Sequence, residues 1–400
     1  MNRRNFLQVG SAGAAGLLTA GGVLAGSSIA HAGTSAHGSS GAHGSSGVHG
    51  DADIHNGSGL PSTRNGLPAA SAVHPPAGNS KIKPISGSWF EFQHLLPLEG
   101  KYWDPALKKF TAAQWKQLIK EISGVGFEYL VLQEIALDGK TFYPSAIAPK
   151  FELGCEDPLE AVLSAADEVG IKFFIGNDFW DDVHKGEFLM KDPGIRKLRA
   201  RAMEEVAGKY SHHPSFYGWY FPNEAYLMPY FDEAFIEYVN DCARVAKTLM
   251  PAAVNLIAPY NIKAEVSDKK FVRQLERMNI DIIAYQDGVG VAQTKLGEPA
   301  RYFEHLYKAH QQASRARIWA DIELFYFEEK THGNLLPADF KRILQQMEDI
   351  SPFVDKILCY QYQGQMNKPG SAVYAGHPSQ ESVRLYEQYR QWLDANPQEF

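Results

Sequence analysis

Between residues 84 and 395 the chain alternates short runs of β-branched and aromatic residues with longer segments whose apolar side chains recur every three or four positions. The short runs predict strands covered on both faces, and the longer segments predict amphipathic helices. Eight such pairs predict parallel βα units that close a barrel, so the expected fold is α/β, a single (β/α)8 TIM barrel. The predicted strands are Pro84–Trp89, Glu128–Leu132, Ile171–Gly176, Phe216–Phe221, Ala253–Ala258, Asp281–Tyr285, Arg317–Asp321 and Lys356–Gln361.

Capping signals support the helices predicted between these strands. Thr111 and Gln114 have the spacing of a capping box, and Trp115 begins the apolar face that follows them. Asp157 and Pro158 are typical of a helix start, because Asp accepts backbone hydrogen bonds and proline suits the first turn. The later helices are predicted near Asp192–Tyr210, Asp232–Leu249, Asp268–Met278, Pro299–Ala313, Pro337–Ile350 and Gln380–Ala395. The last helix covers the last strand, so residues 81–400 are expected to form one domain.

The fourth predicted strand is the most aromatic part of the chain. Residues Phe216–Phe221 read FYGWYF, and Pro222 then stops the ladder because it lacks an N–H group. Asn223 and Glu224 follow at the C-terminal end of the strand, where the active sites of (β/α)8 barrels form. This pair is the leading candidate for chemistry, although Glu224 could instead cap the next helix or pair with an arginine.

Acids, amides and aromatic rings follow the other predicted strands as well, with almost no lysine or arginine. Such a set suits a neutral polyhydroxylated ligand better than a phosphate, because hydroxyls need donors and acceptors and sugar faces need rings. Each ring could equally pack at the barrel rim, and Asp287 could equally be a turn residue. The expected substrate contacts are Asn223, Trp89, Gln133, Asn177, Trp180, Tyr260, Gln286, Asp287, Asp321 and Tyr362.

Three phrases carry a resemblance to a known family, namely residues 85–89 (ISGSW), 218–224 (GWYFPNE) and 285–290 (YQDGVG). With them, the region from about 84 to 395 resembles a bacterial family of glycoside-hydrolase-like barrels of unassigned activity. The Asn223-Glu224 pair after strand four, with an acid after strand seven, also resembles the clan A retaining glycoside hydrolases. That resemblance implies a TIM-barrel glycosidase that acts on a polysaccharide or oligosaccharide.

The resemblance also implies roles for individual residues. Glu224 would be the acid/base that protonates the leaving oxygen, and Asn223 would bind the sugar hydroxyl beside the reacting carbon. Glu323 would be the nucleophile, about 5–5.5 Å from Glu224 in a retaining enzyme. Asp321 precedes Glu323 by two residues and points to the same side of the strand, which leaves two acids available there.

Three other functions remain open. An inverting glycosidase could use Asp287 or Asp321 as the base that activates water. A non-catalytic carbohydrate-binding barrel would keep the rings and lack one of the paired acids, whereas Glu224 and Glu323 are both present. A metal-handling protein would work through histidines of the N-terminal arm described below.

The first residues, with the sequence NRRNFL at positions 2–7, precede a weakly apolar segment rich in glycine and alanine. Ala30-His31-Ala32 then offers an A-x-A cleavage site. This arrangement resembles a twin-arginine signal peptide over residues 1–32, and it implies a periplasmic or secreted protein with no membrane attachment after cleavage. The glycines make the segment a poor membrane span.

Residues 33–80 are rich in glycine, serine and histidine and predict a disordered linker. Histidines recur every six residues, at positions 31, 37, 43, 49 and 55. A flexible chain can fold several imidazoles around Zn²⁺ or Cu²⁺, but a soluble spacer built from duplicated repeats is the simpler interpretation.

Charge and cysteine content limit the partners. The net charge of −7 disfavours nucleic acid and anionic membranes. Cys155, Cys242 and Cys359 form no disulfide framework and are expected to be small buried residues. His212 and His213 are adjacent and lack a second histidine at helical spacing, so neither a catalytic metal nor a cofactor is expected. The sequence leaves the oligomeric state open.

Export is expected to depend on Arg3 and Arg4, because the twin-arginine pathway reads this pair directly. Replacing both with lysine should leave the protein in the cytoplasm, as measured by fractionation and immunoblotting. Undiminished export of the double variant would contradict the assignment of the leader.

Overall fold

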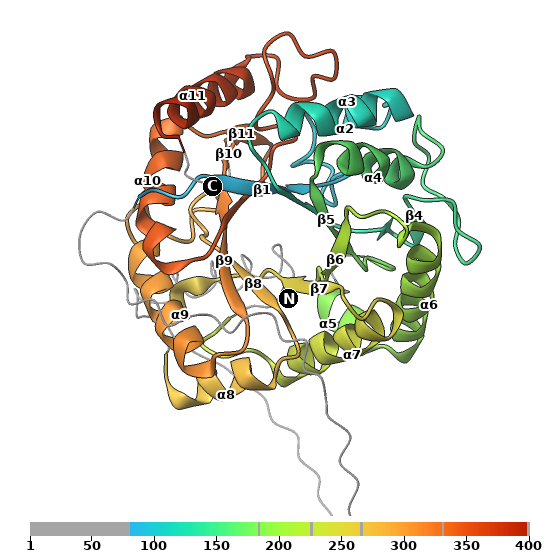
Figure 1. Cartoon of the computed structure of the whole chain (residues 1–400), viewed down its shortest axis with the longest axis vertical. Coiled ribbons are helices and arrows are strands. Elements are labelled where there is room, and N and C mark those ends of the chain that lie inside the picture. Colours follow the sequence, from blue (N-terminus) through green and yellow to red (C-terminus); the bar gives the residue numbers. More distant parts are fainter. Residues whose placement is uncertain (1–80, 183–184, 225–226, 265–266, 330–331, 398–400) are drawn as a thin grey trace, which may run out of the picture. The chain divides into compact units, whose positions relative to one another are not determined.

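Eight parallel strands close into a barrel in the computed structural model, which confirms the predicted fold (Figure 1). The structure describes residues 81–182, 185–224, 227–264, 267–329 and 332–397. The predicted signal peptide and linker lie outside these residues. Around the barrel the strands follow chain order, since β1 pairs with β2 on one side and with β12 on the other. The barrel strands are β1 (Ile85–Phe90), β2 (Tyr129–Leu132), β5 (Lys172–Gly176), β6 (Phe216–Tyr220), β7 (Val254–Ile257), β8 (Ile282–Gln286), β9 (Arg317–Glu323) and β12 (Ile357–Tyr360).

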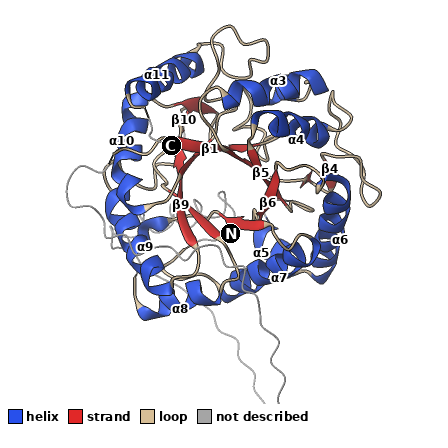
Figure 2. Ribbon diagram, viewed as in Figure 1, coloured by secondary structure: helices blue, strands red, loops and turns tan. Residues whose placement is uncertain are grey.

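Helices form a ring outside the strands, as Figure 2 shows. The eight that alternate with the barrel strands are α3 (Ala112–Ser123), α4 (Pro158–Val169), α6 (Pro193–Tyr210), α7 (Glu233–Leu249), α8 (Lys269–Arg277), α9 (Pro299–Ala313), α10 (Phe340–Ile350) and α11 (Glu381–Ala395). None of the helices in the described part of the chain is both long enough and apolar enough to span a bilayer.

The predicted caps are present. Thr111 and Gln114 form the capping box of α3, whose buried face includes Trp115. Asp157 accepts the backbone N–H of Glu160 at 3.0 Å at the start of α4. Gly170 ends this helix in the left-handed conformation with φ of 77°. The local signals therefore agree with the tertiary fold.

Short elements between the barrel strands and the main helices were not predicted, because pieces of two to six residues carry no periodic signal. They are α2 (Asp104–Leu107), α5 (Gly186–Lys191), the hairpin β3 (Ala136–Leu137) with β4 (Lys140–Thr141), the hairpin β10 (Phe325–Phe327) with β11 (Leu335–Pro337), and the 3-10 turns η2 (Ile262–Ala264) and η3 (Ser351–Phe353). The prediction that α10 starts at Pro337 was wrong. Pro337 pairs with Phe325 in the second hairpin, and Asp339 caps the helix instead.

Aromatic rings fill the barrel interior near the start of the strands. Tyr129 of β2 and Trp319 of β9 lie on strands that are not neighbours, yet their ring centroids are 5.0 Å apart. Phe174 contacts Trp319 at 6.2 Å and Tyr217 at 5.3 Å. These four side chains therefore point inward, and the interior at this end is a packed core.

One extra residue in β6 changes the direction of the side chains that follow it. Phe173 pairs with Phe216 and Phe174 pairs with Gly218, so Tyr217 has no counterpart in β5. Beyond this bulge Trp219 packs on Phe216 at 5.0 Å. The ring of Tyr220 lies 5.8 Å from that of Trp89 on the non-adjacent strand β1, which places Tyr220 inside the barrel.

The close approach of β6 and β7 depends on Gly218. A Cβ atom at this position would lie 1.7 Å from the carbonyl oxygen of Val254, which cannot move without breaking the sheet. We expect Gly218→Ala to lower the free energy of unfolding by about 3 kcal/mol or more, measured by urea denaturation. Gly208→Ala on α6 is the matched control, because a Cβ there meets no atom within 4 Å. This control should be neutral or stabilising by up to about 1 kcal/mol, since alanine is the better helix former. Equal stability of the two variants would contradict the proposed crowding.

Candidate active site

The end of β6 alternates strictly between the inside and the outside of the barrel. Tyr220 points inward, whereas the ring of the next residue, Phe221, contacts Tyr238 of α7 at 6.5 Å on the helix side. Asn223 also lies on the helix side, because its amide interacts with Tyr238 and donates to Asp178 at 2.8 Å. Glu224 is the next residue along the chain and is half-buried.

Asn223 belongs to a buried polar cluster at the ends of β5 and β6. Asp178 accepts Asn223 Nδ2 on the same oxygen, Oδ2, that accepts Arg199 Nε of α6 at 2.8 Å. Arg199 and Asp178 are 2% and 0% exposed, so this ion pair is screened from solvent. Burial raises the pKa of Asp178, and the Arg199 guanidinium partly offsets that rise. The cluster holds the end of β6 in place, and the Asn223 amide is part of it.

The end of β9 supplies two inward-facing acids. Trp319 points into the barrel, and pairing with β8 and β12 runs without a register shift to Glu323, so Asp321 and Glu323 share the side of Trp319. Glu323 Oε2 accepts the backbone N–H of Val291 at 2.7 Å, in the loop after β8. The carbonyl of Glu323 accepts Arg342 of α10 at 2.6 Å. Glu323 therefore sits on a backbone fixed from both sides, two residues closer to the open end than Asp321.

Asp287 is a structural residue in this arrangement. Its Oδ1 accepts the backbone N–H of Val289 at 3.1 Å and that of Glu323 at 3.3 Å, and its Oδ2 accepts Gln346 of α10 at 2.5 Å. The side chain is 0% exposed. Burial raises the pKa of Asp287 to about 6, against the opposing effect of these hydrogen bonds. Because both oxygens hold protein groups, the structure does not support Asp287 as a water-activating base or a substrate contact.

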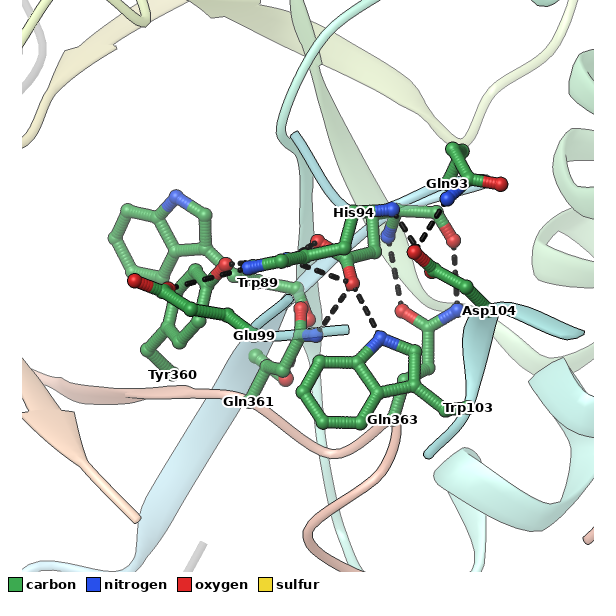
Figure 3. A network of polar contacts seen from close by, with 11 residues as sticks. Trp89, Gln93, His94, Glu99, Trp103, Asp104, Tyr360, Gln361 and Gln363 are labelled. Carbon is green, nitrogen blue, oxygen red and sulfur yellow. Dashed lines mark hydrogen bonds and ion pairs between the residues drawn. The ribbon is translucent and has the colours of Figure 1, made fainter. Parts of the chain in front are cut away.

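A polar network that the sequence analysis did not predict occupies the ends of β1 and β12 (Figure 3). Glu91 Oε1 accepts Trp103 Nε1 at 2.7 Å and Gln361 Nε2 at 2.8 Å. His94 Nδ1 lies 2.9 Å from Glu91 Oε2, and His94 Nε2 lies 3.3 Å from Glu99 Oε2. Glu99 Oε1 in turn lies 3.1 Å from Nδ1 of His332, in the loop that joins β10 to β11. The chain of contacts ties the loop after β1 to the end of β12 and to that hairpin.

The charges of this network depend on one another because it is buried. Burial opposes protonation of His94, but the Glu91 and Glu99 carboxylates outweigh it and raise the pKa of His94 well above its usual value. Burial and the nearby Glu91 raise the pKa of Asp104 to about 8. Asp104 accepts the backbone N–H of His94 at 2.9 Å and is also bonded by the Gln93 amide. His94 and Asp104 thus bind protons more tightly than they do in water.

Glu134 and Gln133, after β2, add unsatisfied acceptors beside this network. Glu134 is fully buried, and within the described residues neither of its oxygens has a hydrogen-bond partner. The same holds for Oε1 of Gln133. Burial, followed by the charge of Glu91, raises the pKa of Glu134 well above the usual value, which favours the protonated form of this carboxyl. Buried acceptors without partners are what a ligand hydroxyl or a water molecule would satisfy.

The remaining predicted contacts divide into two groups. Two of them lie at strand ends, Tyr260 after β7 and Gln286 at the end of β8. The Tyr260 hydroxyl accepts a hydrogen bond from Gln293 Nε2 at 2.9 Å. Other expected contacts face the helices or the core. Asn177 donates to Met203 of α6, Trp180 donates to the carbonyl of Asn177, and the Tyr362 ring packs against Phe127 and Tyr386. Trp89 is 2% exposed against Tyr220. These rings are packing residues and not exposed sugar platforms.

The missed residues could not have been identified from local patterns. His94, Glu99, Trp103 and Asp104 lie in an irregular loop, and the partner His332 is more than two hundred positions away. The spacing of Glu91 and His94 was the only sequence signal, and it is common in unrelated chains. The three cysteines are free and buried, as expected.

The network predicts how stability depends on pH. The folded pKa of His94 lies above its unfolded value of 6.5, and that of Asp104, about 8, lies above 3.8. Both groups bind more protons in the folded state, so their contributions are complete at low pH and are lost as pH rises through the folded pKa values. Between pH 6.5 and 8 the free energy of unfolding should therefore fall. Each group contributes up to about 1.4 kcal/mol per pH unit.

The measurement is urea denaturation at several pH values across this window. Asp104→Asn should flatten the dependence, because a neutral amide keeps the hydrogen-bond acceptor and does not titrate. Glu156→Gln, at a carboxylate that is 82% exposed, should leave the slope unchanged. The same slope in the wild type and in Asp104→Asn would contradict the proposed protonation.

Solved structures share this architecture at low sequence identity. A candidate α-L-fucosidase from Bacteroides thetaiotaomicron superposes with a TM-score of 0.61 at 16% identity, covering 82% of this chain and 99% of that one. An endo-β-1,4-mannanase from Thermotoga petrophila superposes with a TM-score of 0.54 at 12% identity, covering 80% of this chain and 79% of that one. At these identities the similarity establishes a common barrel fold with glycoside hydrolases.

Comparison at the level of sequence gives the family. The chain matches none of the curated proteins with which it was compared. A family model described as a domain of unknown function (DUF4434) matches residues 85–373, from the first residue of β1 to a point beyond β12. Since this match includes all eight barrel strands, the chain belongs to the DUF4434 family.

Proposed function

We propose that this protein is a glycoside hydrolase that cleaves a polysaccharide or oligosaccharide, with Glu224 as acid/base and Glu323 as nucleophile. The observation that carries the proposal is that Glu224 follows β6, the fourth barrel strand, and that Glu323 ends β9, the seventh, on the same side of the strand as the inward-facing Trp319. Two carboxyl groups at the C-terminal ends of these strands fit what glycosidic cleavage needs, because one donates a proton while the other attacks or activates water.

The two glutamates have different surroundings, which this chemistry also requires. Glu323 is fully buried and accepts a backbone N–H from Val291. Glu224 is half-buried and lies beyond Pro222, where the chain has left the sheet. Separate environments allow one acid to stay ionised while the other carries a proton.

A neutral sugar fits the polar groups at this end better than an anionic ligand. The unsatisfied acceptors Gln133 and Glu134 can receive hydroxyl donors, and a protonated Glu134 can also donate to a hydroxyl oxygen. The nearby arginines are already engaged, since Arg199 pairs with Asp178 and Arg342 donates to the carbonyls of Glu323 and Phe325. The fold relationship to a fucosidase and a mannanase is consistent with a sugar substrate but does not identify it.

The proposal also covers the stereochemistry of the reaction and the cellular location of the protein. Retention of anomeric configuration requires the two carboxyl groups about 5–5.5 Å apart, whereas an inverting enzyme needs about 6.5–9.5 Å to admit water. We favour retention with Glu323, since Asp287 is engaged in structural hydrogen bonds and Asp321 lies deeper in the barrel. The leader at residues 1–32 supports work in the periplasm or outside the cell.

The test begins with a screen of the purified protein against polysaccharides and oligosaccharides, read by product sizing. On a substrate found in this way, Glu224→Gln and Glu323→Gln should each lower kcat about 10³-fold or more without changing Tm. Azide should partly rescue one of the two variants. Glu304→Gln, on the outer side of α9, is the matched control and should keep full activity.

The outcomes separate the competing functions. Normal turnover by Glu323→Gln would exclude it as the nucleophile and leave Asp321 as the candidate. Binding of a glycan without turnover by the wild type would support the non-catalytic barrel. NMR of the first-formed anomer distinguishes retention from inversion.

A further inference from the structure

A second group of functional side chains lies before β6, at the opposite end of this strand from Glu224. Glu160 is in the first turn of α4, and His212 and His213 are in the turn between α6 and β6. One donor atom from each of these three residues lies within 4.8 Å of the other two. Two imidazoles and a carboxylate from two separate segments converge on one point, although the sequence shows only an adjacent pair of histidines.

The distances suit a small metal ion. His213 Nε2 and Glu160 Oε2 are 3.0 Å apart. Ligand atoms that bind zinc at about 2.0–2.2 Å in tetrahedral geometry lie roughly 3.3 Å from one another. The three donor atoms thus need only small side-chain rotations to surround one ion.

Asp167 orients the buried histidine as an outer-sphere partner would. His213 Nδ1 lies 2.6 Å from Asp167 Oδ2, and Asp167 Oδ1 accepts the backbone N–H of Ser215 at 2.8 Å. With Nδ1–H donated to Asp167, the other ring nitrogen faces Glu160 and His212. Carboxylates that hold the distal N–H of a metal-binding histidine fix its tautomer and strengthen its binding.

The site is anchored on one side and accessible on the other. His213 is 6% exposed and its ring centroid lies 4.1 Å from that of His212, while the Ser215 hydroxyl donates to the carbonyl of Leu163 in α4. His212 is exposed and Glu160 is half-buried. An ion can therefore enter from solvent, and water can complete its coordination.

We propose that Glu160, His212 and His213 bind one divalent transition-metal ion, with Zn²⁺ as the best match and Asp167 as the positioning residue. Two imidazoles favour zinc and its neighbours over Mg²⁺ or Ca²⁺, which prefer oxygen ligands. The ion would link α4 to the turn that leads into β6. Since this turn lies a whole strand away from Glu224, the ion stabilises the barrel and takes no part in the cleavage step.

The experiment uses the full chain with the six histidines that precede Lys81 replaced by serine, because these residues could bind metal themselves; they are His31, His37, His43, His49, His55 and His74. Zn²⁺ is titrated by calorimetry, and Co²⁺ is added as a spectroscopic probe of coordination. We expect one ion per chain, a visible absorption spectrum of low-symmetry Co²⁺, and a rise in Tm with Zn²⁺.

Substitutions then identify the ligands. His212→Ala and Glu160→Gln should each weaken binding tenfold or more, and Asp167→Asn should weaken it by about 10–100-fold. His305→Ala, in α9, is the control and should bind as the parent does. The exposed position of His212 makes its variant a safe test, and an unchanged Tm without metal confirms that it is folded.

Two results would overturn the proposal. One is the absence of stoichiometric binding in the arm-substituted chain, which would assign any metal affinity of the natural sequence to the arm. The other is equal affinity in the parent and in His212→Ala. Neither result bears on the roles of Glu224 and Glu323. The proposed metal site and the proposed glycosidase activity are therefore tested independently.

Discussion

A single extra residue in β6 determines which of the strand's side chains reach the interior near its C-terminal end. Without the bulge at Tyr217, the two-residue period would turn Tyr220 away from the interior. With it, Tyr220 faces Trp89 across the interior and Asn223 turns toward the cluster of Asp178 and Arg199. Gly218, directly after the bulge, lets the backbone of β7 approach closely. The direction of the side chains at the end of β6 thus depends on backbone geometry several residues before them.

The candidate site is held by polar groups that are removed from water. On one side, the Asp178–Arg199 pair fixes the end of β6, and on the other, Arg342 binds the carbonyl of Glu323. Breaking such a buried interaction leaves an uncompensated charge or dipole, which costs more than the interaction itself contributes. These contacts therefore limit motion of the strand ends, which is how an enzyme keeps reacting groups aligned.

The network around Glu91 likewise fixes the loop after β1 through buried polar contacts. Trp103, Gln361 and His94 all bind the Glu91 carboxylate, so this group joins the loop after β1 to the end of β12, which is distant in sequence. Beside it, burial and the charge of Glu91 raise the pKa of Glu134 well above its usual value, which favours the protonated form. A protonated carboxyl can both donate and accept a hydrogen bond.

The sequence by itself determined the barrel, its eight strands and the caps of α3 and α4, because these depend on local periodicity and on backbone hydrogen bonding near each helix end. It also pointed to Glu224 and Glu323 as candidates, because the hydrophobic pattern predicts where each strand ends and which polar residues follow it. Only the tertiary structure brought Asn223 to Asp178, Gln346 to Asp287, and His94 and His332 to Glu99. It also brought Glu160 to the adjacent pair His212 and His213. Side-chain direction beyond a bulge and contacts between distant loops depend on packing among all strands at once, and no local window of sequence contains that information.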